Sequence, residues 1–310
     1  MRNGNRKFFR EEVMHVYQRA INGFNIFYTL EDRLVFYTIF SVFLRRFNIT
    51  ALALCLMIDH FHALLICGSR QTFYKFVSSV TSLYSRLFNE PVSRKGRLFD
   101  KSFGSAPKMG EKQVRSAIPY LFNNPVEKNL CSDPQAYPWN FLAYLDSDNP
   151  FSDRICRDKC RRRLKRSLSE VDSTFSSDSW MSYAQLKRIY KGLSDMEKRQ
   201  LTDYIIKKYL PFDVVKLCSY YKSLDMMKIA IRSNTGSEYN IREEYNPYSD
   251  TAYQEIENYI SDKVTADIKD VISLSVEVRI TLAADILSNT NATPRQVAKY
   301  LHLVLKSSGA

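Results

Sequence analysis

Two histidines separated by one residue are the feature of this 310-residue chain that most directly suggests chemistry. His60 and His62 lie inside an apolar stretch that runs from residue 49 to residue 67. Successive side chains of a strand point to opposite faces, so both imidazoles would share one face. Two such imidazoles can bind a single divalent metal ion. Two core histidines that only hydrogen-bond to neighbours would show the same spacing, and the spacing alone favours that second interpretation.

A tyrosine and an asparagine form a second pair that could do chemistry. Tyr120 and Asn124 are four residues apart in a stretch with helical periodicity, so they would share one helix face. A tyrosine hydroxyl can act as a covalent nucleophile, and a carboxamide oxygen can ligate a hard metal ion. The alternative is that Tyr120, one of 20 tyrosines, packs a helix that Asn124 ends before Pro125. The spacing alone again favours the alternative.

The elements that must position these residues alternate between strand and helix. Hydrophobic periodicity predicts strands at residues 13–20, 49–67 and 94–103, the last one after a turn. Helical spacing predicts helices at residues 29–47, 73–87 and 111–124. Thr29, with Asp32 three residues later, is typical of a helix start. This order predicts an α+β layer with helices on one face of a mainly antiparallel sheet.

The composition changes near residue 150. Residues 146–153 have a linker-like composition, and residues 154–166 hold eight Lys or Arg in thirteen positions. The next stretch, 167–179, is rich in serine and is expected to be loose. We therefore expect three parts, namely a first domain at 1–150, a basic and Ser-rich linker at 151–180, and a helical domain at 181–310.

Helical patterns dominate the last part of the chain. Ser194 and Glu197 form a capping-box pattern that opens one helix. Further helices are predicted at residues 212–232, 250–263, 274–288 and 294–306. The last of them starts at Thr293-Pro294, and with the preceding helix it has the pattern of a helix-turn-helix. Any two packed helices would give a similar pattern, so both interpretations stay open.

Overall composition limits the class of protein. Hydrophobic residues make up 45% of the chain, enough for real cores, and the formal net charge of +12 favours an acidic partner such as nucleic acid or a membrane surface. Six cysteines show no CxxC pair, which argues against a zinc site and for free thiols in a reducing compartment. The longest apolar runs are too short to span a bilayer. We expect a soluble cytoplasmic protein without a membrane partner.

Five short motifs follow one another between residues 13 and 144. They are VMHVYQR at 13–19, MIDHFHAL at 57–64, FN at 88–89 with GRLF at 96–99, YLFNNPV at 120–126, and YPWN at 137–140. In order and spacing they resemble the motifs of single-tyrosine HUH transposases, in particular the REP-associated tyrosine transposases. Three departures from the family pattern are Ile58 and Asp59 in place of Pro and Asn, Pro119 directly before Tyr120, and Glu127-Lys128-Asn129 in place of a small, Gly-containing stretch.

The resemblance implies a ferredoxin-like α+β fold, the HUH nuclease domain, followed here by an all-helical C-terminal region. It implies a transposase that cleaves and rejoins single-stranded DNA through a 5′-phosphotyrosine intermediate, with Tyr120 as nucleophile. His60 and His62, with Asn124 as third ligand, would hold a divalent metal, Mg²⁺ or Mn²⁺. The implied partner is single-stranded DNA with hairpin-containing element ends, and a homodimer is compatible with this class.

Basic residues supply the candidate DNA contacts. Lys and Arg can track phosphates while bases stack on neighbouring aromatic rings. The residues expected to do so are Arg94, Lys95, Arg97 and Lys101 between the two catalytic motifs, Arg161, Arg162 and Arg163 in the basic run, and Arg295 and Lys299 in the last helix. A solvated surface is the alternative for each residue taken singly. The region after about residue 154 is expected to add affinity without chemistry.

Two other functions compete with the transposase. A non-catalytic DNA-binding regulator could use the same scaffold, but the intact set of His60, His62, Tyr120 and Asn124 argues against it. A replication initiator or relaxase would also use an HUH pair. The order of the motifs and the Asn-Pro-Val segment favour the transposase.

Overall fold

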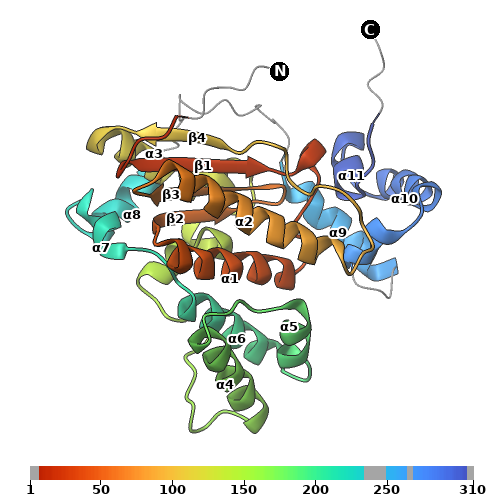
Figure 1. The fold of residues 1–310 in the computed structure, drawn as a ribbon. Coiled ribbons are helices and arrows are strands. Elements are labelled where there is room, and N and C mark those ends of the chain that lie inside the picture. The colour runs from red at the N-terminus through yellow and green to blue at the C-terminus, as the bar shows by residue number, and fades with distance from the viewer. Residues whose placement is uncertain (1–6, 234–248, 264–267, 306–310) are drawn as a thin grey trace.

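A four-stranded antiparallel sheet forms the centre of the protein (Figure 1). The computed structural model describes residues 7–233, 249–263 and 268–305. The strands are β1 (Val13–Arg19), β2 (Thr50–Leu56), β3 (His60–Ile66) and β4 (Gly104–Lys108), in the order β2-β3-β1-β4. With one helix between β1 and β2 and one between β3 and β4, this is the ferredoxin-like arrangement, so the expected fold class is confirmed.

Helices lie on both faces of the sheet, whereas the sequence predicted them on one face only. Helices α1 (Leu30–Phe47) and α2 (Arg70–Asn89) cover the face seen in front in Figure 1. Phe61 points to this face, because its ring lies 5.0 Å from that of Phe36 in α1. Helix α3 (Gly110–Glu127) packs on the opposite face, and it runs through both of its prolines. The histidines that flank Phe61 therefore face α3.

The apolar stretch at 49–67 is a hairpin and not the single strand that the sequence predicted. The chain reverses between Met57 and His60, where the amide of Met57 donates to the carbonyl of His60 over 2.9 Å. Both strands are buried on two sides, so the sequence shows one continuous apolar run and no alternation at the turn. The strand expected at 94–103 is also displaced, because β4 begins only at Gly104.

Helix starts agree closely with the sequence. Thr29 and Asp32 form a complete capping box at α1, and Ser194 and Glu197 form another at α6. Each side chain accepts a hydrogen bond from an amide that has no partner within the helix. At the other end of α1, Asn48 adopts a left-handed conformation with φ of 50° and stops the helix.

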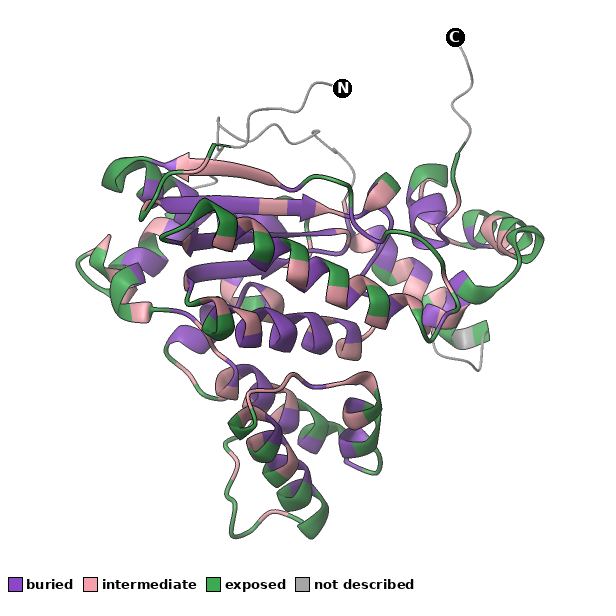
Figure 2. Ribbon diagram, viewed as in Figure 1, coloured by how far each residue is buried: buried purple, intermediate pink, exposed green. Residues whose placement is uncertain are grey.

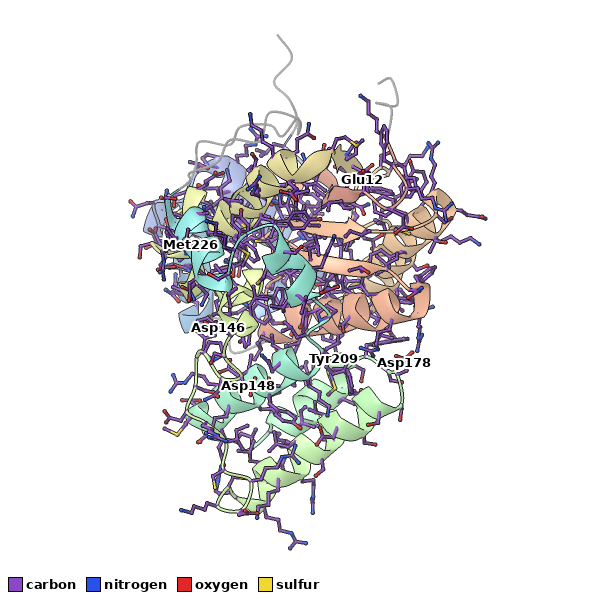
Figure 3. All side chains as sticks on the ribbon, turned by 90° about the vertical axis from the view of Figure 1, so that its left-hand side faces the viewer. Glu12, Asp146, Asp148, Asp178, Tyr209 and Met226 are labelled. Atoms are coloured by element: carbon purple, nitrogen blue, oxygen red, sulfur yellow. The ribbon has the colours of Figure 1, made fainter. Side chains whose placement is uncertain are left out.

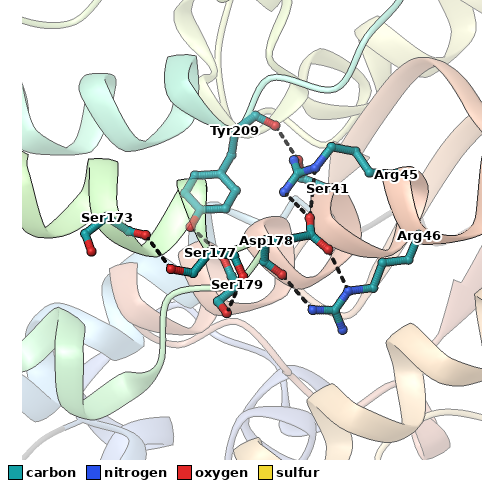
Figure 4. Close-up of polar contacts among 8 residues, drawn as sticks. All are labelled: Ser41, Arg45, Arg46, Ser173, Ser177, Asp178, Ser179 and Tyr209. Atoms are coloured by element: carbon teal, nitrogen blue, oxygen red, sulfur yellow. Dashed lines mark hydrogen bonds and ion pairs between the residues drawn. The ribbon is translucent and has the colours of Figure 1, made fainter.

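A group of three helices docks below α1 in Figure 1. They are α4 (Arg162–Ser176), α5 (Tyr183–Tyr190) and α6 (Asp195–Lys208). Asp178 accepts hydrogen bonds from Arg45 and Arg46 of α1, and Tyr209 donates through its hydroxyl to Ser179 (Figure 4). The Ser-rich stretch expected to be loose is thus mostly helix α4, held by the buried side chains of Leu164, Leu168 and Val171.

The expected linker at 146–153 is also fixed to its surroundings. Asp146, labelled in Figure 3, pairs with Lys228, and Asp148 lies 3.0 Å from Lys207. The carboxylate of Asp203 accepts from the amide of Phe151 and from the hydroxyl of Ser152. Charged and hydroxyl side chains that resemble a solvated linker in the sequence are here hydrogen-bond partners of folded helices.

The remaining helices lie along two sides of the sheet. They are α7 (Val214–Ser219), α8 (Leu224–Ser233), α9 (Thr251–Lys263), α10 (Val276–Asn289) and α11 (Pro294–Tyr300), with short 3₁₀ turns at Ile21–Gly23, Pro134–Ala136, Pro138–Asn140, Leu142–Leu145 and Ile268–Ser273. The helix predicted at 212–232 is two helices, and the one predicted at 294–306 ends at Tyr300, with residue 306 outside the described part. Helices α9 to α11 gather at one end of the molecule (Figure 1).

Burial follows this architecture (Figure 2). The strands β2 and β3 and the inner side of α1 form the core, which continues into the helices at both sides. Within the described residues, no helix is both long enough and apolar enough to cross a bilayer.

A buried histidine near the end of the described chain should make stability depend on pH. His302 donates from Nε2 to the carbonyl of Asn25 over 2.8 Å and stacks on Phe24, and burial lowers its pKa to about 3. The unfolded chain takes up a proton near pH 6.5 whereas the folded one does not, so stability is full above that pH and falls as the pH decreases. Between pH 7 and pH 5 the loss should be about 2 kcal/mol.

Urea unfolding at several pH values measures this loss. The variant His302→Gln keeps an N–H donor for Asn25 but cannot titrate, so its stability should fall less steeply over the same range. An equal slope in the variant and the parent would show that other groups cause the acid sensitivity.

Candidate functional site

Three of the chain's four histidines converge on the sheet face that α3 covers. The register of β1 and β3 sets Tyr17 opposite His62 and Arg19 opposite His60, so side chains of both strands share this face. Nε2 of His15 lies 3.0 Å from Nδ1 of His62, and the ring centroids of His60 and His62 are 4.9 Å apart. All three histidines are buried.

A carboxylate holds the first histidine of the pair. Oδ1 of Asp59 lies 2.5 Å from Nδ1 of His60. Burial by itself raises the pKa of Asp59, but His60, Arg19 and Lys299 outweigh burial and hold that pKa well below its ordinary value. Burial lowers the pKa of His60, and Asp59 only partly opposes this. At neutral pH the pair is therefore a carboxylate next to a neutral imidazole.

The last described helix reaches this carboxylate. Nζ of Lys299 in α11 lies 3.7 Å from Oδ2 of Asp59, and Lys299 is only 9% exposed. Its backbone carbonyl accepts from the amide of Asn25. Gly23 makes the approach possible, because it has φ of +64° and a Cβ there would lie 2.9 Å from Cε of Lys299. Helix α11 is thus part of the surroundings of the histidine pair.

The tyrosine on α3 lies against the same histidines. The ring of Tyr120 meets His15 and His62 edge to face, with centroid distances of 5.7 Å and 5.9 Å. Tyr120 is 7% exposed and Asn124 is 4% exposed. Nδ2 of Asn124 donates to the carbonyl of Tyr120 over 2.9 Å. The hydrogen bonds of the described residues do not join Asn124 to either histidine.

The imidazoles of His60 and His62 are suited to bind a divalent ion, but they do not by themselves complete its coordination. Each Nδ1 of the pair is engaged, by Asp59 in His60 and by His15 in His62, so Nε2 is the nitrogen that would ligate a metal. Such second partners fix the tautomer and orientation of metal-binding imidazoles. Among the described residues, no group of three or more His, Cys, Asp or Glu side chains is arranged to hold a metal ion. A carboxamide or substrate oxygen would have to complete the coordination.

The first part of the chain matches a known protein family. Residues 13–124, from the start of β1 to Asn124, match the model of the family described as IS200-like transposases. Over this segment the chain is similar to IS200-like transposases. The segment contains the sheet, the histidine pair and Tyr120, so all the site residues described above except Lys299 lie inside this transposase-like domain, residues 13–124.

The chain is also similar to one solved structure of a transposase. A solved structure described as a REP-associated tyrosine transposase bound to a REP hairpin matches with 14% identity and a TM-score of 0.37, over 45% of this chain and 81% of that one. A search of curated proteins found no significant match.

The basic residues expected to contact DNA within residues 13–124 differ in exposure and in their partners. Arg97 and Lys101 are exposed and line an open groove of about 670 Å³ beside α2, together with Arg86. This groove lies on the α2 side of the sheet, so it is not part of the histidine site. Lys95 is exposed, whereas Arg94 is partly buried and donates to Asn89 and to the carbonyl of Arg97. Arg94 therefore holds its own loop.

The basic residues after residue 154 also differ in exposure. Arg161, Arg162 and Arg163 are exposed at the start of α4, although Arg161 pairs with Glu197. Arg295 is exposed on α11. Lys299 is not exposed as a DNA contact would require, because all residues from Gln296 to Tyr300 are buried. Helix α11 therefore does not present its middle to solvent, as a recognition helix would need to.

Sequence reasoning missed two partners of the histidine pair. His15 was noted only as part of a motif, although His15, Tyr17 and Arg19 alternate along one strand and so had to share a face. That alternation was the available signal. Lys299 gave no local signal at all, because its contact with Asp59 joins opposite ends of the chain.

Proposed function

We propose that this protein cleaves and rejoins single-stranded DNA through a 5′-phosphotyrosine intermediate on Tyr120, with a divalent metal, Mg²⁺ or Mn²⁺, held by His60, His62 and Asn124. The observation that carries this proposal is the packing of the Tyr120 ring against His62, with a centroid distance of 5.9 Å. This contact supports the proposal, because it brings the hydroxyl-bearing side chain next to the two imidazoles that would bind the metal.

The covalent step is a transfer of one phosphodiester bond. Oη of Tyr120 attacks the scissile phosphorus, and the phenol proton is lost as the new P–O bond forms. The bond between phosphorus and the 3′ oxygen breaks, and that oxygen leaves as a 3′ hydroxyl after taking up a proton. The 5′ end of the next segment stays on Tyr120 as a phosphodiester. Attack by another 3′ hydroxyl reverses the step, so joining needs no external energy source.

The metal would polarise the scissile phosphate and lower the barrier to attack as a Lewis acid. The residues of the chain prepare the site for it. His15 and Asp59 fix the orientations of His62 and His60, and burial keeps His60 neutral. Asn124, one turn after Tyr120, would add a carboxamide oxygen. Lys299 compensates the charge of Asp59 next to the pair.

The proposed substrate is single-stranded DNA with hairpin-containing ends. The exposed cations at Arg97, Lys101 and Arg161 to Arg163 fit phosphate contacts, and the net charge of +12 fits an anionic partner. A DNA-binding regulator would share this surface. Only the chemistry of Tyr120 separates the two functions.

Trapping the covalent intermediate tests the proposal. An oligonucleotide that begins only a few nucleotides before the cut should accumulate an adduct that survives denaturant, because the short upstream fragment whose 3′ hydroxyl could reverse the reaction diffuses away. Peptide mapping should place the DNA on Tyr120. The variant Tyr120→Phe loses only the hydroxyl, so it should bind the same DNA and form no adduct. An adduct on another tyrosine would overturn the residue assignment, and the lack of any adduct with verified ends and several metals would favour the regulator.

A further inference from the structure

A cavity of about 340 Å³ lies at the end of the sheet where β2 turns into β3. Its walls come from separate parts of the chain, and they include Asn25, Arg33, Tyr137, Trp139, Tyr253 and Glu257. The volume is at the lower end of the range for small-molecule sites. Nothing in the proposed cleavage chemistry uses this cavity.

Aromatic rings form the walls of this cavity, and several are fixed in place. Tyr137 donates through its hydroxyl to the carbonyl of Leu56 over 2.8 Å, and Tyr253 is only 6% exposed. Trp139 is partly exposed, and the guanidinium of Arg33 lies 5.6 Å from its ring centroid. Rigid aromatic faces with an open side are suited to a flat ring that stacks on them.

Two buried polar atoms lack partners at the same place. Oδ1 of Asn25 and Nε of Arg33 have no hydrogen-bond partner among the residues that the structure describes. Asn25 is 2% exposed, so its side chain cannot turn to bulk water. One acceptor and one donor are thus offered to a ligand, and a buried atom of this kind is costly unless a ligand or water satisfies it.

The charges of the cavity favour a neutral ligand. Arg33 and Glu257 both line the cavity, and the pKa of Glu257 is raised by burial and lowered in part by Arg33. A carboxyl group in the same wall as this cation disfavours a phosphate. A nucleobase is flat, neutral, and carries both donors and acceptors on its edge, so it meets the stacking, charge and hydrogen-bond requirements together.

The cavity lies next to the histidine pair. Ile58 forms part of the wall and precedes His60 by two residues in the turn between β2 and β3. Tyr253 is also close enough to Asp59 for the two to interact electrostatically. A base in the cavity would therefore belong to a nucleotide near the phosphate that the histidines serve.

We propose that this cavity binds one unpaired nucleobase of the DNA strand next to the scissile phosphate. The inference rests on the proposed function, because it takes single-stranded DNA as the ligand. It gives helix α9, which supplies Tyr253 and Glu257 from outside residues 13–124, a role in selecting the position of the cut.

Tryptophan fluorescence provides a direct test. The chain has two tryptophans, and Trp180 packs against Phe43 away from the cavity, so Trp180→Phe leaves Trp139 as the single reporter. Single-stranded oligonucleotides that span the cut, each with one abasic position, are titrated into this protein. The intact strand should quench Trp139, and one abasic position near the cut should remove most of the quenching and weaken binding about tenfold.

The matched variant is Trp139→Leu in a full-length chain. It should bind the intact strand about tenfold more weakly and should no longer distinguish the intact strand from the abasic one. If this variant does not fold, Asn25→Ala keeps the aromatic walls and should instead change the preference among the four bases at that position.

Two results would contradict the proposal that the cavity binds a base. Equal effects of every abasic position, or unchanged discrimination in Trp139→Leu, would show that no base enters the cavity. Adduct formation on Tyr120 is measured in parallel. A normal adduct without position-specific quenching would contradict base binding in the cavity but not the proposed cleavage. Position-specific quenching without any adduct would support base binding and contradict the proposed cleavage.

Discussion

Replacing His62 by alanine is expected to slow strand cleavage by a factor of about a thousand or more, because a bound metal supplies several kcal/mol of transition-state stabilisation. The same loss is expected for His60→Ala. Both side chains would ligate the ion through Nε2, and neither contributes the hydrophobic core contacts that Phe61 makes between them. Initial cleavage rates on a single-stranded end, at saturating DNA and metal, measure the effect.

A graded series of histidine variants sharpens this test. His15 would act only through Nδ1 of His62, so His15→Leu should cost about 10- to 100-fold, as is usual for partners of metal ligands. His302 is far from the pair in sequence and packs on Phe24, so His302→Gln should cut near the parental rate. Calorimetry measures the binding of Mn²⁺ to the protein without DNA, and this binding should be lost in the His60 and His62 variants. Parental cleavage by either of these two variants would refute the metal site.

The variant Asp32→Asn is expected to destabilise the protein by about 3–5 kcal/mol, the usual cost of leaving a buried charge without its counter-ion. Oδ1 of Asp32 accepts from Nζ of Lys269 over 2.7 Å and from the hydroxyl of Tyr183 over 2.6 Å. Asp32 is fully buried, and Lys269 is 4% exposed, with its ammonium 3.9 Å from the ring centroid of Phe88. The pair joins α1, α2, α5 and the turn at Ile268–Ser273 at one point.

A double-mutant cycle separates the pair from its surroundings. Asp32→Asn combined with Lys269→Met removes both charges, so the double variant should be more stable than Asp32→Asn alone. Asp178→Asn is the matched control, because Asp178 also pairs with two arginines but is about half exposed, and its loss should cost about 1 kcal/mol or less. Urea unfolding of the four proteins gives the coupling energy. Purely additive costs would show that the buried pair does not act as a unit.

The sequence predicted how the candidate site residues lie relative to one another, but it did not predict which other residues surround them. Strand alternation was sufficient to place His60 and His62 on one face, and helical spacing placed Tyr120 and Asn124 one turn apart. The resemblance to single-tyrosine transposases then assigned roles that spacing alone did not favour. The roles are proposals, whereas the structure confirms the strand that carries the histidines and the helix that carries Tyr120.

The predicted connections between elements were less reliable. The sequence did not predict the turn at residues 57–59. Both strands that it joins are buried on two sides, so the apolar run continues from one strand into the next without a break in the pattern. The Ser-rich and acidic stretches around 146–179 looked loose, because their composition is polar. In the folded chain these polar side chains find partners, as Asp178 does with Arg45 and Arg46.

The sequence by itself determined the features that depend on near neighbours. Helix starts at Thr29 and Ser194, the shared face of the histidine pair and the helix that carries Tyr120 all follow from residues within one turn or one strand. Only the tertiary structure decided that His15 orients His62, that Lys299 reaches Asp59, and that Trp139 and Tyr253 enclose one cavity. Those contacts join segments far apart in the chain, and the physical reason is packing. The burial of side chains on α9 and α11 selects which distant residues meet, and no local pattern encodes that choice.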